Sequence, residues 1–419
     1  MAQLREVVAP LLLIYAILLP AALAPELGSV ALPPYRLALL VLLPLAIIHL
    51  LKRRHRPHLP DVLIALGSLW GFTAMLVTSS VAEGLEAGGS FALDGLGCYA
   101  VGRAYVSDVR KLRTVLVYLL PAVLVIAAIM AAEAISHRLI IAPLLEDHKP
   151  FTELRLGLMR SKAVFPHPIA AGLFMASLFS LYFLSMIRWR LRVLGMLAAL
   201  SALFAGSSAA YAMLAMLFAM IAYRSFFTQL LKTRERLSYL FIAAASLLIF
   251  LELATERGAV RVIIELSLDP ATGYYRLLIW EYGSLAVANA PLFGIGNAPM
   301  PRPAWMITES IDNHWLMLAV KYGLPTALLF VVGSIAAVWR CVVRNAPLND
   351  FDRATTSGVV FAVVALTILG WTVAFWSNHF AWYMLLVGTV AALAEQLPRR
   401  SPARTMRLMA QPIVNRRPA

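Results

Sequence analysis

Residues 114–134 read TVLVYLLPAVLVIAAIMAAEA, and no charged side chain occurs in this stretch before Glu133. About 20 consecutive apolar residues are enough for an α-helix to cross the hydrocarbon core of a bilayer. A water-soluble domain rarely contains an uncharged apolar run of this length. The stretch therefore predicts a transmembrane helix.

The composition extends this prediction to the whole chain. Of the 419 residues, 61% are hydrophobic and 14% are charged, and the mean hydropathy is +0.78. A soluble domain with this balance could not present a polar surface to water, so the chain is a polytopic membrane protein. Its two cysteines, Cys98 and Cys341, are too few for a disulfide framework and too far apart in sequence for a CxxC metal site.

Twelve apolar runs predict an all-α fold with about twelve transmembrane helices. The runs cover residues 8–24, 33–51, 62–81, 87–105, 114–134, 168–187, 193–206, 208–223, 237–254, 315–338, 357–376 and 379–396. The run 87–105 is the least apolar, because it is rich in glycine and contains Asp94 and Arg103. Residues 193–223 can be divided differently around Gly206.

The basic residues are distributed unequally between the loops. If the N-terminus is cytoplasmic, the loops on that side contain 25 of the 36 Lys and Arg residues but 7 of the 22 Asp and Glu residues. Cytoplasmic loops of membrane proteins carry such an excess of positive charge. We therefore expect both termini in the cytoplasm, and the net charge of +14 is explained by topology and contact with anionic lipid rather than by a nucleic-acid partner.

This topology predicts one transmembrane domain over residues 1–397 and a basic, disordered cytoplasmic tail over residues 398–419. Two loops on the outer face, about 135–167 and 255–314, are long enough to build a functional site. The second lies between the ninth and tenth predicted helices, and we expect it to carry short helices.

Both long loops contain residues suited to binding an anion. Arg160 and His167 lie in the first loop. In the second, Arg276, Trp280 and Gly283 fall at positions i, i+4 and i+7, which is one face of a short helix lying against the membrane. A structural interpretation stays open, in which Arg276 reaches lipid headgroups and Trp280 belongs to an interfacial aromatic belt. Arginine also grips a diphosphate well by bidentate hydrogen bonds.

Further candidates surround the start of the tenth run. Asp312 and His314 lie just before it, and Lys321 lies six residues inside it. Side chains two residues apart on a helix diverge by about 200°, so only one of Asp312 and His314 is expected to face a given cavity. The Gly294-x-Gly296 pair predicts a turn that allows close approach of the backbone.

These segments together resemble the O-antigen ligase and polymerase superfamily, which are bacterial inner-membrane glycosyltransferases that use undecaprenyl-diphosphate-linked sugars. The matching residues are Arg160, Phe165-Pro166-His167-Pro168, Gly172, Arg276, Trp280, Pro291, Gly294 and Gly296. Family members usually have His-Asn-x-aromatic-Leu before the tenth span. Here Asp312 stands at the position of that histidine, ahead of Asn313, Trp315 and Leu316, and this pattern looks more like the polysaccharide polymerases.

The resemblance implies an inverting, metal-independent transfer at the periplasmic face of the inner membrane, without a cofactor. The chain contains no HExxH spacing. The implied partners are an undecaprenyl-diphosphate-linked oligosaccharide donor, a glycan acceptor, membrane lipids and other polysaccharide export proteins. The implied site residues are Asp312 or His314 as the catalytic base, with Arg160, Arg276, His167, Trp280, Glu281 and Lys321 binding the diphosphate and sugar.

Two alternatives stay open. An O-antigen ligase would use the same donor and transfer the glycan to lipid A core. A lipid-linked sugar flippase or a secondary transporter would place ionisable groups inside the membrane, where Asp94 and Lys321 are predicted to lie.

Overall fold

The computed structural model describes residues 2–27, 30–52, 57–145, 153–155, 157–231, 270–306, 310–344 and 349–395, and these are almost entirely helical. The helices are α1 (Ala2–Arg5), α2 (Val8–Ile17), η1 (Ala21–Leu23), α3 (Pro34–Lys52), α4 (Leu59–Thr78), α5 (Val81–Ala92), η2 (Leu93–Gly97), α6 (Cys98–Tyr105), α7 (Val109–Ser136), α8 (Ala142–Leu145), α9 (Pro168–Phe183), α10 (Trp189–Ala199), η3 (Leu200–Ala205), α11 (Ser208–Ser225), η4 (Phe226–Leu230), α14 (Pro270–Asn289), α15 (His314–Tyr322), α16 (Leu324–Arg344), α17 (Asp350–Leu369) and α18 (Ser377–Leu393). Two short antiparallel hairpins pair β1 (Glu26–Leu27) with β2 (Val30–Ala31), and β3 (Leu154–Arg155) with β4 (Leu158–Met159).

Six helical segments among the described residues are long and apolar enough to cross a membrane. They are α3, α4, α7, α11 with η4, α16 and α17, and shorter apolar helices occur at α2, α9 and α18. The predicted class, a helical polytopic membrane protein, is therefore supported. The number twelve stays a prediction, since the ninth run, 237–254, lies outside the described residues, as does the tail 398–419.

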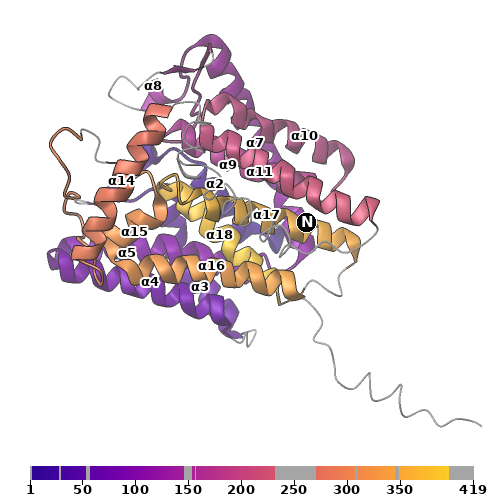
Figure 1. Ribbon diagram of the computed structural model, residues 1–419. Helices are drawn as coiled ribbons and strands as arrows, with labels where there is room; N and C mark the ends of the chain where they lie inside the picture. Colours follow the sequence, from indigo (N-terminus) through magenta and orange to yellow (C-terminus); the bar gives the residue numbers. More distant parts are fainter. Residues whose placement is uncertain are drawn as a thin grey trace, which may run out of the picture.

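The long helices lie side by side, and α14 runs across their ends next to α15 (Figure 1). Helix α18 packs on α6, α16 on α4, and α9 on α10, α11 and α17. The described parts of the loops predicted to face outward lie at the end of the bundle where α8, α14 and α15 are found (Figure 1). The candidate residues of both loops are thus carried to one end of the protein.

Two features of the predicted helices are confirmed by the structure. The glycine-rich run 87–105 is helical, and α5, η2 and α6 continue one another through a π-helical segment that includes Asp94. The break expected around Gly206 is present, because η3 ends at Ala205, Gly206 has φ +56, and α11 begins at Ser208.

The tenth apolar run differs from its prediction as one helix over 315–338. It is divided at Gly323 into α15 and α16. Gly323 has φ +86, which L side chains rarely adopt, and a Cβ there would collide with the Leu292 carbonyl oxygen. The Leu324 amide donates to the Pro291 carbonyl at 2.8 Å instead of continuing the helix. A contact with a distant loop therefore breaks the helix, and hydrophobicity alone did not reveal it.

Ion pairs join residues that the predicted sidedness assigns to the same face. Arg103 donates to Asp61 at 2.9 Å and to the two oxygens of Glu395 at 2.8 and 2.6 Å. Arg113 pairs with Asp352 at 2.9 Å. All five residues fall at loops or helix ends predicted to be cytoplasmic. These contacts therefore agree with the predicted topology, in which successive loops lie on alternate faces of the membrane.

Candidate functional site

Glu133 fastens the first outward loop to the end of α7. Its side chain is fully buried, and one carboxylate oxygen accepts hydrogen bonds from the Ser161 hydroxyl at 2.6 Å and from the amides of Lys162 and Ala163 at 3.1 and 2.9 Å. The other oxygen accepts from the Ile140 amide at 2.9 Å. A buried carboxylate with four donors is well satisfied. The segment that follows Arg160 is therefore held in a fixed position.

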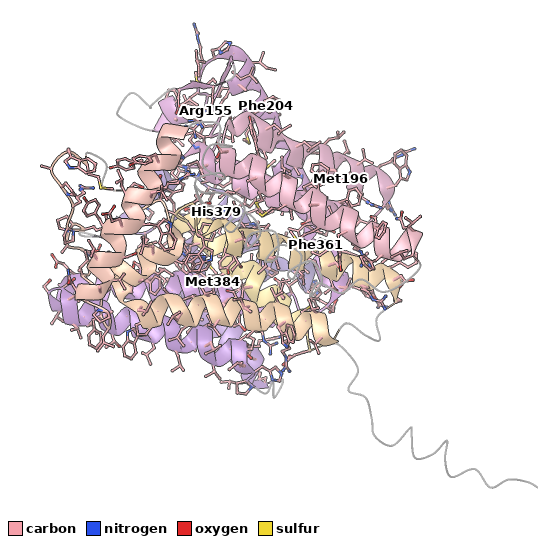
Figure 2. The ribbon with its side chains drawn as sticks, viewed as in Figure 1. Arg155, Met196, Phe204, Phe361, His379 and Met384 are labelled. Atoms are coloured by element: carbon pink, nitrogen blue, oxygen red, sulfur yellow. The ribbon has the colours of Figure 1, made fainter. Side chains whose placement is uncertain are left out.

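Arg160 projects from this segment toward the turn between η3 and α11. Its Nη1 donates to the Glu153 carboxylate at 2.5 Å and its Nε to the Ala205 carbonyl at 3.4 Å. Burial opposes ionisation of Glu153, but the hydrogen bonds and charges of Arg160 and Arg155 together outweigh it and lower the pKa of this carboxyl. Arg155 (Figure 2) donates to the same carboxylate and to the Gly206 carbonyl.

His167 lies at the N-terminus of α9, within the electrostatic reach of Arg160 and Asp312. Its Nδ1 accepts a hydrogen bond from the Ile169 amide at 3.1 Å, and its ring packs against Trp376 with centroids 4.9 Å apart. Burial and the charge of Arg160 lower the pKa of His167 to about 4, although Asp312 opposes this. The imidazole is neutral at pH 7, and its Nε2 carries the proton as a hydrogen-bond donor.

Asp312 lies just before α15 and accepts a hydrogen bond from the Ser310 hydroxyl at 2.6 Å. It is half-buried. The next residue, Asn313, caps α15 by accepting from the Leu316 amide at 2.9 Å. The cap fixes where the helix begins, and so fixes the direction in which Asp312 and His314 leave the backbone.

His314 is 1% exposed and surrounded by aromatic rings. Its amide donates to the carbonyls of Gly370 and Val373 at 2.7 and 3.1 Å, and its Nδ1 accepts from the Phe375 amide at 3.4 Å. Its Nε2 has no hydrogen-bond partner among the residues that the structure describes. Burial lowers the pKa of His314 to about 3. The ring is therefore neutral, and an unused Nε2–H donor is the group it offers to a ligand.

The two candidate bases have different surroundings, in keeping with their spacing. Asp312 interacts electrostatically with His167 on the first outward loop. His314 instead lines a cavity of about 520 Å³ with Lys321 on the next turns of α15. The structure thus gives the chain two adjacent polar regions, one around Arg160 and Asp312 and one around His314 and Lys321.

We call the second region the Lys321 cavity. Its polar and aromatic walls come from α3, α5, η2, α15, α18 and the segments that contain Asn297 and Phe375. Among the residues that line it are Arg36, Glu83, Asp94, His314, Lys321 and Phe380. Donors, carboxylates and ring faces in one space are typical of sites that bind hydroxyl-rich ligands.

Asp94 lines this cavity, and its negative charge is neutralised by an ion pair with Arg36. Both of its oxygens accept from Arg36, at 2.9 and 2.7 Å, and one also accepts from the Tyr35 hydroxyl at 3.0 Å. Paired carboxylates and guanidinium groups satisfy one another inside a membrane protein. Asp94 and Lys321 share the cavity, but the ion pair of Asp94 is with Arg36.

The Gly294-x-Gly296 turn is a clamp on the end of α15. Both glycines have positive φ, +66 and +64. The amides of Ile295 and Gly296 donate to the carbonyls of Val320 and Lys321 at 2.8 and 3.0 Å, which satisfies two carbonyls at the C-terminal end of the helix. The close approach that the glycines were expected to allow is present, and it is to α15.

Helix α14 carries Arg276, Trp280 and Glu281, and residues 276–283 are helical as predicted, although the helix is 20 residues long rather than short. Trp280 stacks on Trp371 with centroids 5.8 Å apart and planes 8° from parallel. A Cβ at Gly283 would lie 2.6 Å from Leu316 of α15. Arg276 is half-buried, one turn away on the same face, whereas Glu281 is exposed. Arg276 therefore lies on the side of α14 that faces α15.

Three polar residues that organise these regions were not predicted as site residues: Glu133, Glu153 and Arg36. Glu153 lies inside the first outward loop, whereas Glu133 and Arg36 are charged groups at or near the end of an apolar run. That position is the signal available in the sequence, but it does not identify the partner. The structure brings Arg160 and Asp312 within electrostatic reach of His167, and it places His314 and Lys321 in one cavity.

These observations define a multi-pass helical membrane protein with two groups of candidate polar residues at one end of its helices. Within that class, residues 194–331 match the O-antigen ligase family, which confirms the resemblance to the O-antigen ligase and polymerase superfamily. The match covers a third of the chain and includes α14, the clamp and α15, and it supports a membrane enzyme of the ligase or polymerase type. No curated protein matches the chain.

Proposed function

We propose that the protein polymerises undecaprenyl-diphosphate-linked oligosaccharide units at the outer face of the bacterial inner membrane. The observation that carries this proposal is the grouping of Arg160, His167 and Asp312 from two separate loops. An arginine beside a neutral histidine donor suits a diphosphate, and a carboxylate nearby suits an acceptor hydroxyl.

In the proposed reaction the acceptor hydroxyl oxygen attacks the anomeric carbon of the donor sugar, opposite the diphosphate. The new C–O bond forms as the bond from this carbon to the diphosphate oxygen breaks, and the diphosphate leaves with the electron pair. Configuration at the anomeric carbon is inverted. Arg160 and Arg276 stabilise the charge that develops on the leaving group.

Asp312 accepts the proton of the attacking hydroxyl in this proposal. His314 is less suited to that task, because its Nδ1 already accepts the Phe375 amide and its Nε2 carries a proton. We assign His314 the role of a donor that, with Lys321, positions a sugar hydroxyl in the Lys321 cavity. Trp280 and Glu281 would contact the sugars from α14.

Positive side chains replace a metal ion in this mechanism. An Asp-x-Asp spacing, which glycosyltransferases often use to hold a metal, occurs at Asp350 and Asp352. These carboxylates pair with Arg353 at 3.1 Å and Arg113 at 2.9 Å. They also lie at the start of α17, on the face predicted to be cytoplasmic. They are therefore engaged elsewhere, and we propose a metal-independent transfer.

The acceptor separates the proposed polymerase from the alternative ligase. A polymerase extends another lipid-linked repeat, whereas a ligase transfers to lipid A core. The aspartate at position 312, where ligases have histidine, favours the polymerase. Supplying purified protein with the lipid-linked donor and either acceptor should give a ladder of longer lipid-linked glycans, and a product on lipid A core would support the ligase instead.

A matched pair of variants tests the site within the same assay. Arg160→Gln should abolish transfer, and Arg160→Lys should lose nearly as much because bidentate geometry is lost. Arg138→Gln, which removes an exposed charge from the same outward loop, should leave transfer unchanged. If Arg160→Gln kept normal transfer, the site assignment would be wrong. Transbilayer movement of the lipid without any transfer would indicate a flippase.

A further inference from the structure

A second basic cavity lies at the opposite end of the helices, between α9, α10, α11 and α17. Its volume is about 390 Å³. Three arginines from different parts of the chain line it, together with apolar side chains. Among the residues that line it are Arg192, Arg224, Arg353, Phe351 and Asp350. We call this space the Arg192 pocket.

The arginines of the Arg192 pocket differ in how they are held. Arg224 is 7% exposed and donates to the Ser357 hydroxyl at 3.4 Å. Arg353 pairs with Asp350 at 3.1 Å, but the Asp350 side chain is 91% exposed. Arg192 lies over the Phe183 ring, 5.0 Å from its centroid. Asp350 is the only carboxylate among the described lining residues, which include three arginines.

The surroundings of the Arg192 pocket indicate a membrane boundary. Arg192, Arg224 and Arg353 each belong to a loop or helix end that the positive-inside rule assigns to the cytoplasm. Phe351 in the pocket wall is 67% exposed, and Leu230, next to the wall residue Gln229, is 69% exposed. Exposed apolar side chains beside buried positive charge match an amphipathic ligand better than a fully soluble one.

We propose that the Arg192 pocket binds the phosphate-bearing headgroup of an anionic phospholipid from the inner leaflet. Basic pockets between transmembrane helices on this face are suited to such headgroups. The guanidinium groups of Arg192 and Arg224 hold the phosphate oxygens, while Phe351 and Leu230 lie beside the acyl chains. This inference does not depend on the proposed glycosyl transfer, because no residue of the candidate functional site contributes to the pocket.

Lipid titration of the purified full-length chain in neutral detergent tests the proposal. Native mass spectrometry would count bound phosphatidylglycerol and bound phosphatidylcholine. We expect saturable binding of phosphatidylglycerol, and about tenfold weaker binding in Arg192→Gln because one charge-assisted contact is lost. Arg190→Gln is the matched control, since it removes the same charge from the same helix at an exposed position outside the pocket.

The outcomes separate the possible ligands. Equal weakening in Arg192→Gln and Arg190→Gln would overturn the site in favour of diffuse surface attraction. Equal binding of phosphatidylcholine would overturn the requirement for an anionic headgroup. Displacement of phosphatidylglycerol by millimolar inorganic phosphate or diphosphate would identify a soluble phosphate site and overturn the lipid assignment. If Arg224→Gln fails to fold, Arg192→Gln and Arg192→Lys still test lipid binding by the pocket, because Arg192 is half-buried.

Discussion

The backbone amide of Phe375 donates a hydrogen bond to Nδ1 of His314 at 3.4 Å. The contact assigns the imidazole proton to Nε2, the nitrogen without a partner among the described residues. A protonated Nε2 cannot accept a proton from an acceptor hydroxyl. The relationship therefore separates the roles of two residues that stand two positions apart and that the sequence left as alternatives.

We predict that Asp312 and His314 respond differently to isosteric replacement. Asp312→Asn removes the proposed base, so kcat should fall by about 10²–10⁴ with little change in KM. His314→Gln keeps an N–H donor of similar reach, so its effect should be about tenfold. Rates measured at saturating donor would check this. Equal, mild losses in both variants would mean that neither is the base.

Glu133 should act as a positioning residue for Arg160. In Glu133→Gln one of the two accepting oxygens becomes an amide donor that faces backbone N–H groups, and this should destabilise the loop by about 2 kcal/mol. We expect faster trypsin cleavage in residues 155–162 together with a fall in kcat. Glu6→Gln, at an exposed position outside both outward loops, is the control for proteolysis. Unchanged cleavage in Glu133→Gln would contradict the anchoring role.

We predict that Gly323, at the clamped end of α15, cannot be replaced without loss of stability. Gly323→Ala should cost about 2 kcal/mol or more, because the residue has φ +86 and the new Cβ meets the Leu292 carbonyl oxygen. Gly89→Ala is the matched control, since no atom lies within 4 Å of its added Cβ. Thermal unfolding in detergent would compare them. Equal Tm values for the two variants would show that the clamp does not limit stability.

Acidification should destabilise the protein through His314. Burial lowers the pKa of this imidazole to about 3 in the folded state from an ordinary value of 6.5, so the unfolded chain binds the proton first as the pH falls. The contribution of His314 to stability is complete above pH 6.5 and decreases below it by about 1.4 kcal/mol per pH unit. His314→Gln should flatten the dependence of Tm on pH between about 6.5 and about 4. An identical slope in the variant would show that other groups cause the effect.

Cysteine labelling from outside intact cells tests the topology. Ala298→Cys is exposed in the outward loop and should react, whereas Arg190→Cys should react after the membrane is permeabilised. The native thiols Cys98 and Cys341 are fully buried and should stay silent. Ser161 lies in the same outward loop as Arg160, but its side chain is fully buried against Glu133, so it is unsuitable for labelling. Reaction of Arg190→Cys in intact cells would overturn the sidedness.

Hydrophobicity predicted the helices well, because an apolar run has one stable conformation in a bilayer. The break at Gly206 was also readable, since small and polar residues interrupt the run there. The break at Gly323 was not, because its cause is the carbonyl of Leu292 from another loop. The same limit applies to the site: the sequence identified Arg160, His167 and Asp312 as candidates, but the anchors Glu133 and Glu153 depend on contacts that only the folded chain contains.

The ion pair between Arg103 and Glu395 has a consequence for the order of synthesis. The two residues are separated by 292 positions, so Arg103 is synthesised long before its second partner. Until then Asp61 is the carboxylate available to it. The segment after the last helix therefore supplies the second carboxylate that neutralises Arg103. A chain that ended before Glu395 would keep the buried Arg103 guanidinium with Asp61 as its carboxylate partner.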